Sequence, residues 1–282
     1  MLGHKLIQQL DPEFEVFATL RGDVVTVERF GIFDPQRMIP GVDPESAESI
    51  ERAIVGVRPD VVINAIGVIK QVPNAKDVIN TLTINSIFPH RLADASARHG
   101  FRLFTISTDC VFDGKKGHYN EDDITNATDL YGKSKALGEV IGIKCLTIRT
   151  SIIGRELWTG HSLVEWVLSN RGKRIRGFTN AIYSGFPTIV FADILRSLII
   201  DHKELSGLYH IASEPINKFE LVGLINKYYE AGIDIEPYGD FVIDRSLDGS
   251  RFNAQTGFRP AGWEEMVKRM AQDPTPYDSW RR

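Results

Sequence analysis

Short apolar runs alternate with helical spacing over the first 150 residues of the chain. Continuous or nearly continuous apolar runs predict strands at Glu15–Leu20, Asp60–Ala65, Phe101–Ile106 and Lys144–Arg149. Apolar positions at helical spacing predict helices over 4–10, 45–57, 75–99 (kinked at Pro89) and Tyr131–Ile141. Strands that alternate with helices are typical of βαβ units, so we predict an α/β fold with a doubly wound parallel sheet.

The pattern is looser after residue 150. Helical spacing recurs over 161–170, 189–201 and 218–231, Gly207–Ala212 is strand-like, and Lys173–Asn180 mixes basic residues with glycine. We predict a dinucleotide-binding Rossmann domain over 1–150, to which 189–205 return. A smaller C-terminal substrate-binding region would comprise 151–188 and 206–282, with a cleft between the two.

The first residues predict the end of a phosphate-binding turn. Gly3 is followed directly by a predicted helix, whereas a dinucleotide fold opens with a strand and a glycine-rich turn. We therefore expect that the first strand of the sheet is truncated in this chain.

Composition excludes several classes of protein. Of the 282 residues, 43% are hydrophobic and 25% charged, which excludes a disordered or low-complexity chain. A net charge of −4 gives no basic footprint for nucleic acid or an anionic membrane surface. The two cysteines, Cys110 and Cys145, are too few for a disulfide scaffold. Without a metal-like cluster or a membrane-length apolar run, we expect a cytoplasmic protein with no metal site.

A tyrosine and a lysine stand one helical turn apart in the helix predicted after residue 130. Tyr131 and Lys135 are at i and i+4, and therefore on one face. An ammonium beside a phenol lowers the tyrosine pKa from its ordinary value of ~10, so the phenol can pass a proton to a carbonyl oxygen. Thr108 follows a buried strand upstream, and its hydroxyl can hydrogen-bond the same oxygen. We therefore predict Thr108, Tyr131 and Lys135 as the catalytic residues.

Several segments resemble dTDP-4-dehydrorhamnose reductase, an extended short-chain dehydrogenase/reductase. The segments that carry the resemblance are Arg58–Ala65, Asn85, Ile106–Gly114, Tyr119–Asp123, Tyr131–Glu139, Arg149–Ser151 and Gly185–Thr188. The resemblance implies that NADPH reduces a nucleotide-linked 4-keto-deoxysugar, such as dTDP-4-dehydrorhamnose to dTDP-rhamnose, for surface polysaccharide. It also implies the roles of Thr108, Tyr131 and Lys135, and allows a homodimer and Mg²⁺.

The expected cofactor site lies at the ends of the predicted strands. Arg21 stands where NAD-selective proteins carry an acid, and a guanidinium suits a 2′-phosphate, so NADPH is favoured while NADH stays open. The small residues Ala65 and Gly67 would let a flat cofactor approach the backbone. The predicted cofactor contacts are Gly3, Arg21, Asp43, Asn64, Ala65, Gly67, Asn85, Tyr131 and Lys135.

Departures from the family pattern keep alternatives open. Cys110 stands where the family has tyrosine, and the proline before the active-site tyrosine is missing from Asn126–Leu130. A UDP-linked amino-sugar reductase and a nucleotide-sugar epimerase are the enzyme alternatives. A dinucleotide-binding regulatory subunit is the non-enzyme alternative. A dehydratase is disfavoured, because it needs glutamate as a base where Cys110 stands.

Overall fold

The computed structural model describes residues 1–70 and 76–281. Its α-helices are α1 Leu2–Leu10, α2 Val25–Glu28, α3 Ala47–Val57, α4 Val78–Leu82, α5 Phe88–His99, α6 Leu130–Leu137, α7 Leu163–Ser169, α8 Thr188–Ile200, α9 Lys218–Tyr228, α10 Ser250–Thr256 and α11 Trp263–Ala271. Its strands are β1 Ala18–Thr19, β2 Met38–Ile39, β3 Val61–Asn64, β4 Arg102–Ile106, β5 Cys145–Arg149, β6 Ile152–Ile153, β7 Arg174–Phe178, β8 Ala181–Tyr183, β9 Phe186–Pro187, β10 Gly207–His210, β11 Ile216–Asn217, β12 Asp234–Tyr238 and β13 Ile243–Asp244. Short 3₁₀ turns are η1 Pro35–Arg37, η4 Asp109–Val111 and η5 Tyr277–Arg281, and η3 Thr83–Ile87 is a π-helical turn.

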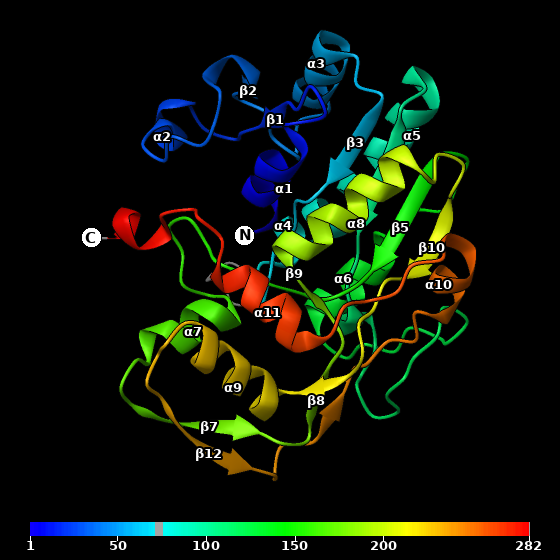
Figure 1. The fold of residues 1–282 in the computed structure, drawn as a ribbon. Coiled ribbons are helices and arrows are strands. Elements are labelled where there is room, and N and C mark those ends of the chain that lie inside the picture. Colours follow the sequence, from blue (N-terminus) through cyan, green and yellow to red (C-terminus); the bar gives the residue numbers. More distant parts are fainter. Residues whose placement is uncertain (71–75, 282) are drawn as a thin grey trace.

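The central sheet is parallel and has the order β10-β5-β4-β3. β1 and β2 form a separate parallel pair, and within the described residues neither is hydrogen-bonded to β3. The carboxyl ends of β3 and β5 point toward the smaller lower part of the molecule (Figure 1). The predicted α/β fold with a parallel sheet is therefore confirmed.

Helices cover both faces of the central sheet. Neighbouring residues of β4 enter different cores, because successive side chains of a strand point to opposite faces. Phe104 packs with α1 and α8, whereas Leu103 packs with α3 and α5. The β3 side chains Val61, Val62 and Ile63 are half-buried, whereas those of β5 are buried throughout.

The long helix predicted over 75–99 is interrupted. α4 passes through the π-helical turn η3 into α5, whose first turn holds Pro89. Proline is tolerated in the first turn of a helix, where its missing N–H needs no intrahelical partner, and the π-helical turn before it breaks the regular hydrogen-bond pattern. The start of the predicted range, up to residue 75, lies outside the described residues.

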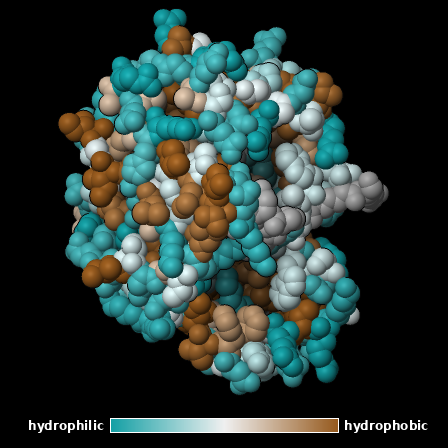
Figure 2. Space-filling model, turned by 180° about the vertical axis from the view of Figure 1, so that it is seen from behind, coloured by the Kyte–Doolittle hydropathy of each residue, from teal (hydrophilic) through white to brown (hydrophobic). Residues whose placement is uncertain are grey.

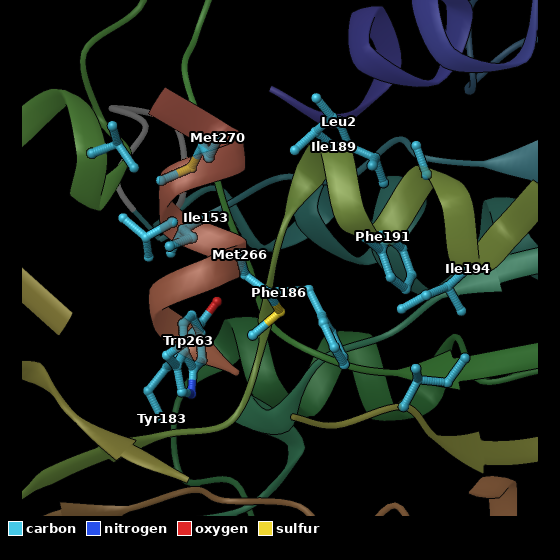
Figure 3. Packing of buried hydrophobic residues seen from close by; sticks show 14 of the residues in the cluster. Leu2, Ile153, Tyr183, Phe186, Ile189, Phe191, Ile194, Trp263, Met266 and Met270 are labelled. Carbon is cyan, nitrogen blue, oxygen red and sulfur yellow. The ribbon is translucent and has the colours of Figure 1, made fainter. Parts of the chain in front are cut away.

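The C-terminal region shares one core with the sheet. Strands β7 and β12 pair in parallel, while β8 lies between β11 and β13. Figure 3 shows Tyr183 of β8 against Trp263 of α11, with Met266 and Phe186 above them; the two rings have centroids 5.5 Å apart. Figure 2 shows a hollow on the rear face, between the larger upper part and the smaller lower part.

Three predicted elements need correction. The helix predicted to reach Ile141 ends at Leu137, because Gly138 caps it and the Val140 N–H donates to Thr147 Oγ1 of β5 at 3.2 Å. The strand predicted at Glu15–Leu20 shortens to the two residues of β1, since only these pair with β2. The stretch of basic residues and glycine after residue 173 contains strand β7, because it pairs with β12 some 60 residues later along the chain.

In the part of the chain that the structure describes, no helix combines the length and apolar character needed to cross a membrane.

Candidate active site

Thr108 follows β4 and begins the short turn η4. Its Oγ1 accepts a hydrogen bond from the Cys110 N–H at 3.1 Å and donates to Asp109 Oδ1 at 3.0 Å. Thr108 and Asp109 are both buried. The turn that begins at Thr108, called the corner below, therefore presents a fixed hydroxyl and a fixed carboxylate at the carboxyl end of the sheet.

Helix α6 brings Tyr131 and Lys135 to the same corner. Asp129 caps the helix by accepting from the Gly132 N–H at 2.9 Å. A Cβ at position 132 would lie 2.1 Å from the Cys110 carbonyl oxygen, so only glycine lets α6 approach the Thr108 turn this closely. The three predicted catalytic residues therefore meet in space.

Lys135 is buried and holds the end of β4. Its Nζ donates to the Ile106 carbonyl oxygen at 2.6 Å, and an ammonium has two further donors to offer. Burial lowers the pKa of Lys135 to about 8, and the charge of Glu139 opposes that shift. The lysine is thus an ammonium at neutral pH and loses its proton in mildly alkaline solution.

The expectation that the pKa of Tyr131 is lowered is wrong for this geometry. Burial raises the pKa of Tyr131, as do the nearby Cys110 and Asp109, and the Thr108 hydroxyl opposes the rise only in part. Lys135 is directed to the Ile106 carbonyl and does not offset the burial. Tyr131 is therefore a neutral phenol at neutral pH in this structure.

Cys110 is a neutral thiol beside this corner. Burial, reinforced by the charge of Asp109, raises its pKa to about 12. A thiol that keeps its proton cannot remove one from a sugar carbon, so the geometry agrees with the argument against a dehydratase.

The predicted cofactor segment after β3 is held by Asn85. The Asn85 side chain accepts from the Val68 N–H at 2.9 Å, donates to the Val68 carbonyl at 3.0 Å and donates to Ser134 Oγ at 3.1 Å. Asn85 is buried, as is Asn64, whose Oδ1 accepts from the Ile66 N–H at 3.2 Å. In this structure Asn85 positions the segment that contains Ala65 and Gly67, and ties it to α6.

Two other predicted cofactor residues pair with each other. Arg21 Nε donates to Asp43 Oδ2 at 3.1 Å, and 66% of the Arg21 side chain is exposed. The guanidinium has further N–H groups to offer, so its chemistry fits a phosphate, although Asp43 competes for it. Gly3 lies exposed in the first turn of α1, and a Cβ at this position would have no neighbouring atom within 4 Å.

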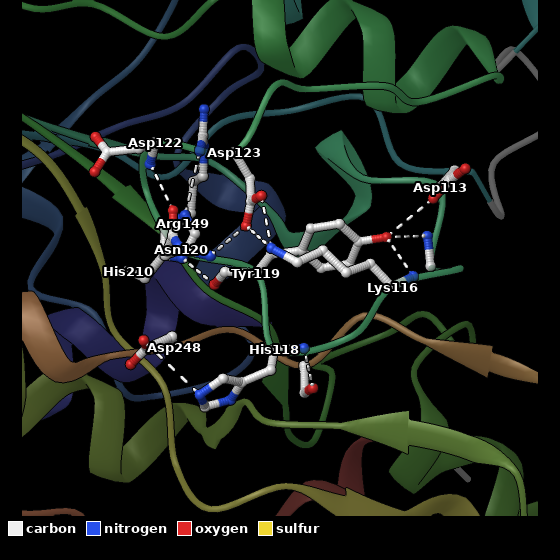
Figure 4. A network of polar contacts seen from close by, with 12 residues as sticks. Asp113, Lys116, His118, Tyr119, Asn120, Asp122, Asp123, Arg149, His210 and Asp248 are labelled. Carbon is white, nitrogen blue, oxygen red and sulfur yellow. Dashed lines mark hydrogen bonds and ion pairs between the residues drawn. The ribbon is translucent and has the colours of Figure 1, made fainter.

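The sequence analysis did not identify the buried ion pair between Glu139 and Arg149. Glu139 accepts from Arg149 Nε at 2.8 Å and from Ser107 Oγ at 2.7 Å. Arg149 also contacts His210 Nε2 at 3.2 Å, and His210 Nδ1 lies 2.9 Å from the Tyr119 carbonyl, as Figure 4 shows. Because arginine only donates and a carbonyl only accepts, His210 is neutral with its proton on Nδ1, and burial lowers its pKa to about 3. Glu139 and Arg149 stood in the recognised motifs, but only the fold pairs them.

Among residues 1–70 and 76–281, no group of three or more His, Cys, Asp or Glu side chains is arranged to hold a metal ion.

The parallel sheet agrees with a dinucleotide-binding fold, and the family and named relatives of the chain identify the class as an NAD(P)-dependent oxidoreductase. The family model described as "RmlD substrate binding domain" matches residues 1–275, and the chain belongs to that family. The family resemblance seen in the sequence is thereby confirmed.

Three relatives illustrate the similarity. The dTDP-4-dehydrorhamnose reductase of Aggregatibacter actinomycetemcomitans is 28% identical over 256 residues, which cover 80% of this chain and 85% of that protein. The solved structure of a hypothetical dTDP-4-dehydrorhamnose reductase from Sulfolobus tokodaii is 26% identical, with a TM-score of 0.76. The match covers 93% of this chain and 94% of that one. The dTDP-4-dehydrorhamnose reductase of Bacillus anthracis, solved in complex with NADP, is 22% identical with a TM-score of 0.73. The match covers 90% of this chain and 97% of that one, and it supports the fold alone.

Proposed function

We propose that this chain catalyses the NADPH-dependent reduction of a nucleotide-linked 4-keto-deoxysugar, with dTDP-4-dehydrorhamnose as the first candidate substrate. The observation that carries the proposal is the meeting of Thr108, Tyr131 and Lys135 where β4 and α6 converge. A buried hydroxyl, a protonated phenol and an ammonium together are what carbonyl reduction needs. The family of the chain and the names of its relatives support the same reaction.

The residues divide the chemistry between them. Bound NADPH would supply a hydride to the carbonyl carbon. Tyr131 gives its phenolic proton to the carbonyl oxygen, and Thr108 donates a hydrogen bond to that oxygen before and during the transfer. The Lys135 ammonium is held at the Ile106 carbonyl, and its remaining donors fit ribose hydroxyls of the cofactor.

The wider assignment follows the two parts of the molecule. Gly3, Arg21, Asp43, Asn64, Ala65, Gly67 and Asn85 would line the dinucleotide site in the 1–150 domain. The region of 151–188 and 206–282 would hold the sugar nucleotide against the carboxyl edge of the sheet. Arg21 favours the 2′-phosphate of NADPH, because a guanidinium meets phosphate with paired hydrogen bonds.

The proposal is tested by mixing the protein with NADPH and a panel of 4-keto sugars linked to dTDP or UDP. Consumption of NADPH with a 4-hydroxy sugar as product, and fastest with the dTDP-linked substrate, is expected. Interconversion of sugar epimers without net NADPH consumption would instead identify an epimerase. Tight NADPH binding with no turnover of any sugar would favour the regulatory subunit.

A further inference from the structure

A second lysine lies beside the candidate proton donor Tyr131, on the segment that follows β3. Lys70 Nζ lies over the Tyr131 ring, 5.5 Å from its centroid, which is within the range of a cation–π contact. The same Nζ donates to Asp129 Oδ2 at 2.8 Å, and Asp129 is the residue that caps α6. Lys70 therefore contacts both the tyrosine and the start of the helix that carries it.

The Asp129 carboxylate uses its two oxygens for two different tasks. Its Oδ1 accepts from the Gly132 N–H at 2.9 Å, and its Oδ2 accepts from the Lys70 ammonium. The side chains of Lys70 and Asp129 are 35% and 40% exposed, so the pair is partly shielded from solvent. Because Tyr131 stands between Asp129 and Gly132 along the chain, this ion pair holds the ammonium at the tyrosine ring.

The segment that carries Lys70 is fixed to α6 at a second point. Asn85 accepts from the Val68 N–H at 2.9 Å and donates to Ser134 Oγ at 3.1 Å, so it links this segment to the middle of the helix. The contact between Lys70 and Asp129 links the same segment to the start of the helix. Two contacts on one helix thus determine the position of the ammonium.

The other charges around Tyr131 do not favour the loss of its proton. Burial raises the pKa of Tyr131, and Cys110, Asp109 and Asp129 raise it further. The Nζ of Lys135, one turn further along α6, donates to the backbone carbonyl at the end of β4 at 2.6 Å. A cation at the ring of Tyr131 therefore acts against several unfavourable influences.

We propose that Lys70 is a positioning residue whose ammonium stabilises the negative charge left on Tyr131 when the phenol gives up its proton. This inference rests on the proposed function. In that reaction the carbonyl carbon accepts a hydride from NADPH, the O–H bond of Tyr131 breaks, and the proton passes to the carbonyl oxygen. A phenolate attracts an ammonium more strongly than a neutral phenol does, because charge–charge attraction is added to the cation–π contact. Lys70 thus stabilises the transition state more than the bound substrate, which raises the rate.

Replacing Lys70 by Met removes the charge and keeps a side chain of similar length. We expect kcat for the 4-keto sugar to fall roughly fivefold to tenfold, while the KM values for the sugar and for NADPH change little. Lys70→Arg should restore most of the rate, because a guanidinium also stacks on an aromatic ring and pairs with a carboxylate. Lys133→Met, which changes an exposed lysine of α6, is the matched control and should leave kcat unchanged.

Two kinetic outcomes would overturn the inference. If Lys70→Met raises KM and leaves kcat unchanged, the lysine binds a substrate or the cofactor and does not act on the proton transfer. If Lys70→Arg is as slow as Lys70→Met, the positive charge at this position is not what matters.

A titration without substrate separates this inference from the proposed function. A fluorinated tyrosine incorporated in place of Tyr131 ionises at a lower pH than the other tyrosines, so its phenolate absorbance can be followed in the folded protein. Lys70→Met should move this ionisation to a pH roughly 0.5–1 higher, whereas Lys70→Arg and Lys133→Met should not. If the unmodified protein reduces no 4-keto sugar, the proposed function fails, while the titration still decides the role of Lys70. An ionisation that Lys70→Met does not move would show that the pair with Asp129 is only structural.

Discussion

Burial shifts the pKa values of Tyr131 and Lys135 in opposite directions. The phenol keeps its proton because burial raises its pKa, whereas the ammonium loses stability and its pKa falls to about 8. Below about pH 8, therefore, Tyr131 is a neutral phenol and Lys135 an ammonium. A carbonyl reductase needs these two states together.

Replacing Tyr131 by Phe removes the proton donor and keeps the ring. We expect turnover to fall by ~10²–10⁴, the scale of general acid catalysis, while NADPH affinity changes little. Steady-state NADPH oxidation and a fluorescence titration of NADPH measure the two quantities. Tyr238→Phe, on β12 of the C-terminal region, is the matched control and should keep full activity. A Tyr131→Phe enzyme with more than half the normal rate would reject the proposed role.

Replacing Arg21 by Ala should narrow the preference for NADPH over NADH by roughly tenfold, because one charged contact to the 2′-phosphate is lost. The Asp43 carboxylate competes for the same guanidinium, so Asp43→Asn should widen the preference. The ratio of kcat/KM for the two cofactors is the measurement. Arg37→Ala, which changes a half-buried arginine paired with Asp11, is the control. An unchanged ratio in Arg21→Ala would contradict the assignment.

At the scale of elements, the end of β4 combines three tasks in three consecutive residues. The Ile106 carbonyl accepts from Lys135, Ser107 donates to Glu139, and Thr108 supplies the hydroxyl of the corner. Since Glu139 also pairs with Arg149 of β5, the buried ion pair fixes β4, β5 and the segment after α6 to one another. The side-chain exposures of 4% for Arg149 and 10% for Glu139 leave little solvent to screen this pair.

Replacing Glu139 by Gln should shift the pH dependence of the reaction. The Glu139 charge raises the Lys135 pKa, so its loss lowers that pKa below about 8. Since the ammonium is the active form, the decline of kcat/KM at high pH should begin at a lower pH than in the unmodified protein. Ser107→Ala removes the hydrogen bond but keeps the charge, and should reduce the rate without moving the decline. Thermal unfolding confirms that each variant is folded, and an unmoved decline in Glu139→Gln would show that Glu139 is only structural.

At the scale of the whole molecule, side chains of residues 273–277 contact the first helix, α1. Lys5 of α1 is buried and forms an ion pair with Asp273, and its Nζ donates to Thr275 at 3.2 Å. His4, the preceding residue of α1, contacts the Tyr277 hydroxyl at 2.8 Å. Since α1 also packs on α8, the tail stabilises one whole covering layer of the sheet.

Replacing Asp273 by Ala should destabilise the fold by about 3–5 kcal/mol, because it leaves the Lys5 ammonium buried without its carboxylate. The double variant Lys5→Met with Asp273→Ala should be more stable than the single one, since no unpaired charge is then buried. Urea unfolding followed by circular dichroism measures both. Glu13→Ala, which breaks an exposed pair with Arg196, should cost far less. A single variant no less stable than the Glu13→Ala protein would contradict this account.

The sequence pattern was sufficient to predict those elements that depend on interactions between neighbouring residues. The helix that holds Tyr131 and Lys135 and the apolar runs of β3, β4 and β5 follow from neighbouring residues, and these elements are confirmed. The predictions were wrong for features that depend on contacts between segments far apart along the chain. β7 needs its partner β12, α6 is ended by the chain turning toward Thr147, and the pKa of Tyr131 depends on burial that no spacing reveals.

The sequence by itself determined the order of strands and helices, the class of fold and the three residues of the candidate catalytic centre, since short-range periodicity and motif spacing carry that information. Only the tertiary structure decided which charges meet. Glu139 pairs with Arg149 and contacts Ser107, Arg21 pairs with Asp43, and Lys5 pairs with Asp273 near the other end of the chain. Electrostatic interaction depends on distance and burial in space, and separation along the chain determines neither.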